Sequence, residues 1–142
     1  MSRPSGGDLE KAQTSGGCQK PETRHVDTGR LRAAVTEYGP VAFLLTVTAD
    51  ARPHCTAVTT TWVGDTLVAE CGTQSVANIT KRPEIAVVWP PPHWGDHSLI
   101  IDGTASIHDH QPPRVEVHPT RVVRYPTPEP TGGTTALECE PV

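Results

Sequence analysis

The apolar residues of this chain change their spacing at about residue 40. Before that point, four of them recur at the spacing of one helix face: Leu31, Ala34, Val35 and Tyr38. This spacing predicts one short amphipathic helix. Asp27 or Thr28 can cap its start with a side-chain oxygen, and Gly39-Pro40 ends it.

After residue 40 the pattern becomes one of strands. Runs rich in β-branched and apolar residues, separated by turn residues, cover 41–49, 54–63, 66–71, 84–89 and 98–108. A last strand runs through Val115 and Val117, with 121–125 after a break at Pro119. A helical turn over Ser75 to Lys81 interrupts the series. Because tight turns favour antiparallel pairing, we predict a mainly β fold: an antiparallel six-stranded barrel, closed or nearly closed, with one or two short helices.

The ends of the chain differ in composition from its middle. Residues 1–24 are polar and rich in Gly, Ser and Lys, and residues 126–142 begin with the stretch PTPEPTGG. Such segments bury too little apolar surface to offset the entropy of ordering them. We therefore expect a disordered or extended N-terminal tail at 1–24, one barrel domain at 25–125 and a C-terminal tail at 126–142.

Composition and charge disfavour several classes of partner. The chain has 142 residues and a formal net charge of −4, and its Lys and Arg residues are scattered, which argues against nucleic-acid binding. No apolar run approaches the roughly 20 residues that cross a bilayer, and the first 24 residues lack the apolar segment of a secretory signal. We expect a cytoplasmic protein that binds neither nucleic acid nor a membrane.

Cysteine and histidine do not indicate a metal centre. The four cysteines form no C-x-x-C pair, so reduced thiols are expected: Cys18, Cys55, Cys71 and Cys139. His108, His110 and His118 lie near Pro112-Pro113 with no cysteine close in sequence, which favours a solvated loop over a structural zinc site. We predict no metal site.

Four ordered segments carry more information than the strand pattern alone. They are 41–54 (VAFLLTVTADARPH), 75–83 (SVANITKRP), 98–105 (SLIIDGTA) and 117–123 (VHPTRVV). They resemble, in order and spacing, four parts of the pyridoxamine 5′-phosphate oxidase-like family. These are its opening hairpin, its Ser-x-Lys-x-x-Asn-Leu-x-x-Asn-Pro turn, its strand ending in Gly-x-Ala and its closing strand. The resemblance covers about residues 30–125 and implies a split barrel.

The resemblance further implies a homodimer that binds FMN or the deazaflavin F420 at its interface. A folded body of about 100 residues buries little surface by itself, which also favours an oligomer. The resemblance places the cofactor ring against the second strand and the phosphate by the helical turn. The candidate cofactor contacts are Thr59, Thr60, Thr61, Trp62, Thr73, Ser75, Asn78 and Lys81.

Ordinary structural roles compete with these assignments. High strand propensity explains the threonines of the second strand equally well, and helix capping is an alternative for Ser75 and Asn78. Trp89 and Trp94 can cover a planar ligand or pack as a hydrophobic lid. The basic phosphate ligands of the oxidase are replaced by Thr56, Thr61 and Ser75, so weaker FMN binding is expected than in the oxidase itself.

The leading functional hypothesis is a flavin- or F420-dependent oxidoreductase that transfers a hydride to or from a small organic substrate. No catalytic residue can be singled out, because the cofactor would carry the chemistry. Two alternatives remain open. One is a non-catalytic split barrel that binds or carries a cofactor. The other is a haem-binding split barrel, since the chain has seven histidines.

Overall fold

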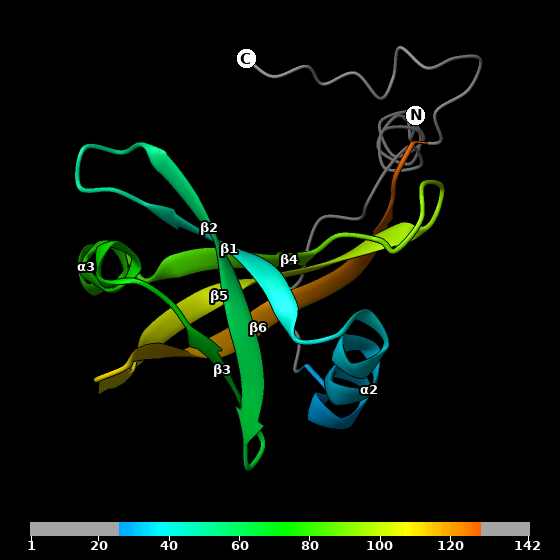
Figure 1. The fold of residues 1–142 in the computed structure, drawn as a ribbon, viewed down its shortest axis with the longest axis horizontal. Helices are drawn as coiled ribbons and strands as arrows, with labels where there is room; N and C mark the ends of the chain where they lie inside the picture. Colours follow the sequence, from blue (N-terminus) through cyan, green and yellow to red (C-terminus); the bar gives the residue numbers. More distant parts are fainter. Residues whose placement is uncertain (1–25, 129–142) are drawn as a thin grey trace, which may run out of the picture.

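The computed structural model describes residues 26–128, which form one six-stranded barrel with two helices (Figure 1). The helices are α2 (Thr28–Tyr38) and α3 (Thr73–Lys81). The strands are β1 (Val41–Val47), β2 (Pro53–Val63), β3 (Thr66–Glu70), β4 (Glu84–Trp89), β5 (His97–His110) and β6 (Pro113–Pro126). The predicted fold class is confirmed.

The strands close into a barrel in the order β1-β2-β3-β6-β5-β4, and every neighbouring pair is antiparallel. Alternation along each strand produces the core, because every second side chain faces the same side of a sheet. On β5, for example, Leu99, Ile101 and Ala105 are all buried. The largest fully buried side chains include Trp89, Leu44, Leu67, Leu99 and Ile101.

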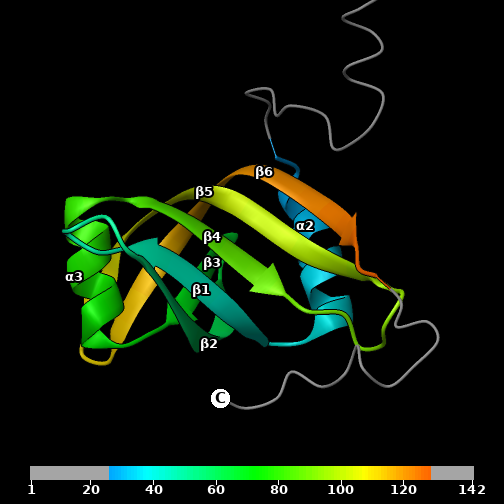
Figure 2. The ribbon, with the colours of Figure 1, turned by 90° about the horizontal axis from the view of Figure 1, so that it is seen from above.

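The two helices lie at opposite ends of the barrel (Figures 1 and 2). Asp27 caps α2 as predicted, because its Oδ1 accepts a 3.1 Å hydrogen bond from the backbone N–H of Arg30. At the other end of α2, the Tyr38 hydroxyl donates to the carbonyl oxygen of His97 on β5 at 2.7 Å. This bond ties α2 to the barrel. The second helix, α3, connects β3 to β4.

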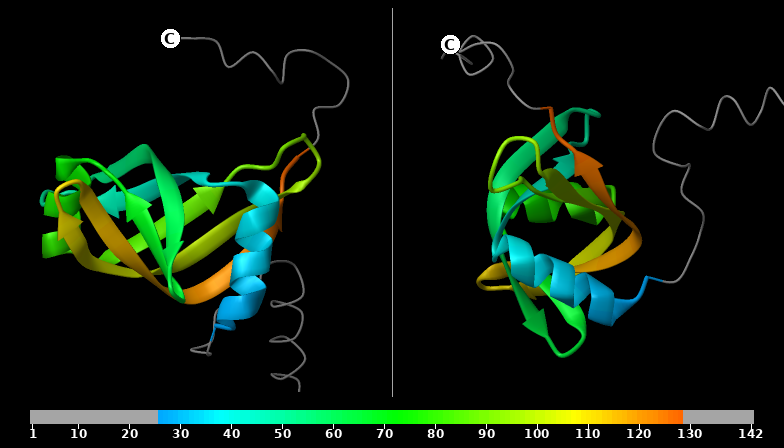
Figure 3. Two further views of the ribbon diagram at one scale, coloured as in Figure 1. Left: turned by 60° about the horizontal axis from the view of Figure 1, so that its bottom comes forward. Right: turned by 90° about the vertical axis from the view of Figure 1, so that its right-hand side faces the viewer.

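The predicted break of the last strand at Pro119 is wrong. β6 continues through Pro119 and pairs with β5 along the long hairpin visible in Figure 3. The register shifts between Asp102 and Gly103, and Gly103 lies opposite Pro119. A Cβ at Gly103 would stand 3.0 Å from the Cα of Pro119 and closer still to the carbonyl oxygen of His118. The missing side chain therefore lets the irregular part of β6 approach, and the strand continues past the proline.

The histidines near this hairpin lie in strands: His108 ends the predicted strand 98–108, and His110 and His118, expected in a solvated loop, also belong to β5 and β6. His108 is on β5 and His118 is on β6. The Nδ1 of His108 lies 2.9 Å from Glu116 Oε2, and the Nε2 of His118 lies 2.9 Å from Ser106 Oγ. These polar pairs join neighbouring strands, which explains why histidines suit this part of the sheet.

Two further expectations concern the ends of the chain and its relation to membranes. The tail predictions for 1–24 and for most of 126–142 lie outside the described residues and stay predictions. Between residues 26 and 128, no helix has the length and apolar character needed to cross a membrane.

Candidate functional site

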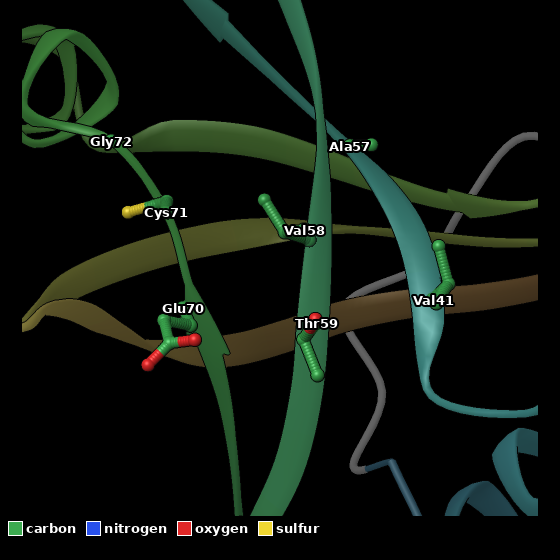
Figure 4. Close-up of a pocket in the computed structure, with 7 residues that line it drawn as sticks. All are labelled: Val41, Ala57, Val58, Thr59, Glu70, Cys71 and Gly72. Carbon is green, nitrogen blue, oxygen red and sulfur yellow. The ribbon is translucent and has the colours of Figure 1, made fainter.

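A groove opens in the barrel wall between β2 and the junction of β3 with α3. Its volume is about 340 Å³. Seven residues line it, as Figure 4 shows: Val41, Ala57, Val58, Thr59, Glu70, Cys71 and Gly72. The lining combines apolar side chains from β1 and β2 with polar groups at the end of β3. This composition suits a small ligand that has both apolar and polar surface.

The groove exists because two paired strands separate here. The ladder between β2 and β3 ends at the pair Thr59 and Glu70. Beyond this pair, residues 53–58 of β2 are paired with β1 alone, and the chain that leaves β3 enters α3. The backbone N–H of Thr60 donates to the carbonyl of Pro40, toward β1. Ala57, three residues away, therefore directs its N–H and C=O toward the opposite side, which is the groove. Within residues 26–128, no strand pairs with Ala57 from that side.

Negative charge dominates the groove. Among the residues that line it, Glu70 has the only charged side chain. Cys71 beside it is half-buried, and burial together with the nearby Glu70 carboxylate raises the pKa of its thiol. Arg114 lies opposite Glu70 in the ladder of β3 with β6, but its Nη2 bonds Oδ2 of Asp109 at 2.9 Å.

The four predicted ring contacts on β2 divide between the two faces of the strand. Thr59 lines the groove, and Thr61 is exposed two residues further along the same face. Thr60 faces the interior, where its hydroxyl donates to a backbone carbonyl at 2.8 Å. Trp62 packs against the core, and the guanidinium of Arg32 lies 4.7 Å from its ring centroid. Thr59 is thus the member of this set that the fold brings to the groove, and its contact with a ligand stays a prediction.

The predicted phosphate contacts lie on different sides of α3. Thr73 is exposed at the first residue of the helix, beside the groove, whereas Lys81 is exposed in the last turn at the far end. Ser75 and Asn78 are buried. The Nδ2 of Asn78 donates to Thr46 Oγ1 at 2.9 Å, and Ser75 Oγ has no hydrogen-bond partner among the described residues. The bond between Asn78 and Thr46 fastens α3 to β1.

The tryptophan that ends β4 and the one in the loop that follows differ in environment. Trp89 is 0% exposed, and its Nε1 donates to the carbonyl oxygen of Gly39 at 3.0 Å. Trp94 is 59% exposed. Trp89 is therefore part of the barrel core and is not available to cover a ligand.

The side chains of the described region do not form an obvious centre for metal or nucleophilic chemistry. In residues 26–128, no group of three His, Cys, Asp or Glu side chains is placed to hold a metal ion. Ser106 and Glu116 both approach His118, but they meet the same ring nitrogen, Nε2, at 2.9 and 4.0 Å. A serine–histidine–acid relay needs the acid on the other ring nitrogen, so this cluster is not one.

Of the residues that line the groove, only Thr59 was predicted from the sequence as a cofactor contact. Two features of the sequence nevertheless point to the others. Alternation along 54–63 places Ala57 on the same face as Thr59. Glu70, Cys71 and Gly72 occupy the end of a predicted strand directly before a predicted helix. Which strand edge stays unpaired depends on the ladder of the whole sheet, and no local pattern shows it.

Two known proteins are similar to this chain in sequence, and several solved structures are similar to it in fold. No family model matches the sequence. Over 130 residues the chain is 32% identical to two uncharacterized mycobacterial proteins, Mb0449c of Mycobacterium bovis and MT0457 of Mycobacterium tuberculosis. The alignment covers 82% of this chain and 91% of each relative. The chain belongs to the family of these two mycobacterial proteins.

Solved structures show which fold this chain has. A protein of Listeria innocua described as a pyridoxamine 5′-phosphate oxidase aligns with a TM-score of 0.56 at 19% identity, over 69% of this chain and 98% of that one. An F420 reductase aligns with a TM-score of 0.53 at 19% identity, over 63% and 94%. HutZ, a haem storage protein of Vibrio cholerae, aligns with a TM-score of 0.53 at 12% identity, over 66% and 94%. The fold is that of the pyridoxamine 5′-phosphate oxidase-like split barrels, as the sequence motifs indicated.

Proposed function

We propose that this protein is a flavin- or F420-dependent oxidoreductase, and that its groove holds the ring of the cofactor. The observation that carries the proposal is the edge of β2 at Ala57, where no strand of residues 26–128 pairs with it and its backbone N–H and C=O face the groove. The pyrimidine-like edge of a flavin or deazaflavin presents N–H and C=O groups that can pair with such an edge. Val41 offers apolar contact to the ring, and Thr59 offers a hydroxyl.

The groove fits the ring of these cofactors better than it fits their phosphate. No Lys or Arg is among the residues that line it. The N-terminal N–H groups of α3, near Gly72 and Thr73, are the favourable feature for an anion. When bound, the ring accepts or donates the hydride, and the residues of the groove position it and exclude water.

Filling the groove should weaken ring binding. The side chain of Ala57 is exposed and lines the groove, so Ala57→Trp should place an indole where the ring would lie and weaken binding at least about tenfold. Thr61→Trp is the matched control, because Thr61 is exposed on the same strand and face but does not line the groove. Fluorescence titration with riboflavin, FMN and F420 measures the effect. Equal affinities in the parent and in Ala57→Trp would exclude this groove as the site.

Turnover distinguishes the enzyme from a carrier. A parent chain that binds a ring cofactor should also transfer hydride between the reduced ring and an organic acceptor. A chain that binds the ring tightly but never changes its redox state is a carrier. The cofactor released on denaturation, identified by mass spectrometry, shows whether the ring is a flavin or a deazaflavin and whether it carries a phosphate.

We further propose that two copies pair through the outer face of the barrel beside the groove. Apolar residues lie opposite one another in register across five strands, from β2 through β1, β4 and β5 to β6: Ala57, Phe43, Val88, Ile100 and Val123. We call this set the apolar row. Phe43 is 39% exposed, and Val41, the next outward residue on β1, is 58% exposed. Contiguous exposed apolar surface marks an interaction site.

A second copy is the partner that best suits the apolar row. In a two-fold dimer the same face of each copy meets, so a face without charge in its central row brings no like charges together there. Two-fold pairing is also the commonest mode of association. Val41 belongs to this face and also lines the groove, so a second copy seated here would border the ligand. The dimer and the cofactor site are therefore linked by position.

A charge in the apolar row should separate the two copies. Phe43→Glu would bury a carboxylate in the interface, so we expect a monomer at concentrations where the parent is a dimer, with dimer affinity reduced by about a hundredfold or more. Val63→Glu is the control, because Val63 is 45% exposed but lies outside the row. Sedimentation velocity gives the result. A parent that stays monomeric at high micromolar concentration, or a dimeric Phe43→Glu chain, would contradict the proposal.

The groove gives less support to haem binding. Haem iron takes His, Met, Tyr or a Cys thiolate as its axial ligand. Cys71 is the one residue of these types in the lining, and the raised pKa of its thiol disfavours the thiolate. A Soret band that grows on addition of haem and depends on Cys71 would reverse this assessment.

A further inference from the structure

Glu70 lies where the groove meets the start of α3, and the described cations are engaged or distant. Arg114 is its neighbour across the ladder. Nη2 of the Arg114 guanidinium bonds Asp109 Oδ2 at 2.9 Å, which offsets the positive charge, while the buried Nε has no hydrogen-bond partner among the described residues. Other arginines bond groups outside the groove: Arg32 to Gly64, Arg52 to Asp50, Arg82 to Ala49, Arg121 to Asp102 and Arg124 to Glu37. Lys81 is at the far end of α3, and Arg30 belongs to α2, at the other end of the barrel.

The start of α3 does not outweigh this carboxylate. A helix N-terminus acts as about half of a positive elementary charge. The Glu70 carboxylate is a full negative charge, two residues before the N-cap Gly72. The thiol of Cys71, between them, has a pKa raised first by burial and then by Glu70. The net field at this end of the groove is therefore negative.

We infer that Glu70 determines which charge the groove accepts: a neutral or cationic group at the β3–α3 junction, and not a phosphate. This inference rests on the proposed ring site. It implies that the ligand presents to this junction an end of the ring system that carries no phosphate, or a cationic substituent. Glu70 is thus a specificity-determining residue: a phosphate at this end of the groove weakens binding, and the same ring without it binds more tightly.

Riboflavin and FMN form a matched pair of probes, because they differ only by the phosphate. The full-length parent should bind riboflavin more tightly than FMN. Glu70→Gln should strengthen FMN binding roughly tenfold, since it removes one charge–charge repulsion, and should change riboflavin binding by less than about twofold. Glu84→Gln is the control: Glu84 is exposed at the start of β4, outside the groove lining, and the net charge changes equally. Rising salt should strengthen FMN binding to the parent, because it screens the repulsion.

A second measurement needs no ligand. The pKa of the Cys71 thiol should fall in Glu70→Gln and stay unchanged in Glu84→Gln. The pH dependence of alkylation reports it, in a full-length chain whose other three cysteines are replaced by serine.

The outcomes separate the two proposals. If FMN binds the parent more tightly than riboflavin, or if Glu70→Gln changes neither the FMN affinity nor the thiol pKa, the inference about Glu70 is wrong while the ring site stands. If no ring binds the parent but the thiol pKa falls in Glu70→Gln, the proposed function is wrong and the negative field of the groove is confirmed.

Discussion

A Gly103→Ala chain should unfold at a clearly lower denaturant concentration than the parent, with a loss of about 3 kcal/mol in the free energy of unfolding. The added Cβ would stand 3.0 Å from the Cα of Pro119 and closer to the carbonyl oxygen of His118. Both neighbours are backbone, so they cannot rotate away as a side chain would. β6 would have to move away from β5 at the register shift, at the cost of ladder bonds on both sides.

Gly29→Ala is the matched control for this substitution. Gly29 lies in the first turn of α2, where a Cβ would meet only Oδ1 of the capping Asp27 side chain, at 3.3 Å, a contact that a few tenths of an ångström of side-chain movement relieves. Alanine favours a helix over glycine by about 1 kcal/mol, so the control should be neutral or slightly stabilising. Urea unfolding of the two variants measures the difference. Equal stability of Gly103→Ala and the parent would show that β5 and β6 do not approach as closely as described.

Trp89→Ala should cost about 3–5 kcal/mol, because it opens a cavity in the barrel core. Trp89 is 0% exposed, and its indole N–H is the partner of the Gly39 carbonyl at the end of α2. Its loss therefore removes core packing and also leaves a carbonyl without its donor. The chain should melt at a much lower temperature or fail to accumulate in folded form.

Trp94→Ala is the control, since it removes the same side chain from a position where that side chain is 59% exposed. A change of no more than about 0.5 kcal/mol is expected. Thermal unfolding followed by circular dichroism compares the two variants. Equal losses of stability in the two variants would contradict the assignment of Trp89 to the core and of Trp94 to the surface.

The fold followed closely from local patterns. The cap at Asp27, the helix spacing that ends at Tyr38 and the alternation on β5 each depend on neighbours within a few residues. Such local patterns predict the elements because a buried helix face and a buried strand face need apolar residues at different spacings. The break predicted at Pro119 was wrong for a different reason. Proline interrupts an ideal ladder, but the register shift opposite Gly103 accommodates it.

The residues of the candidate site could be predicted from the sequence only in part. Thr59 was named from the sequence and lines the groove, whereas Thr60 and Asn78 have inward-facing side chains that bond within the protein. The family motifs point to the second strand and the helix after the third, and both flank the groove. They do not state which face each side chain takes, since a shift of one residue reverses the facing of a strand.

By itself, the sequence determined the six strands, the two helices and the alternation that fills the barrel, because each depends on residues close together in the chain. The tertiary structure decided where β2 separates from β3, and therefore that the backbone of Ala57 faces a groove. It also decided that Glu70 stands there while Arg114 is held by Asp109. These features depend on strand pairing across the sheet, and pairing between distant segments is set by the packing of the whole barrel rather than by any one segment.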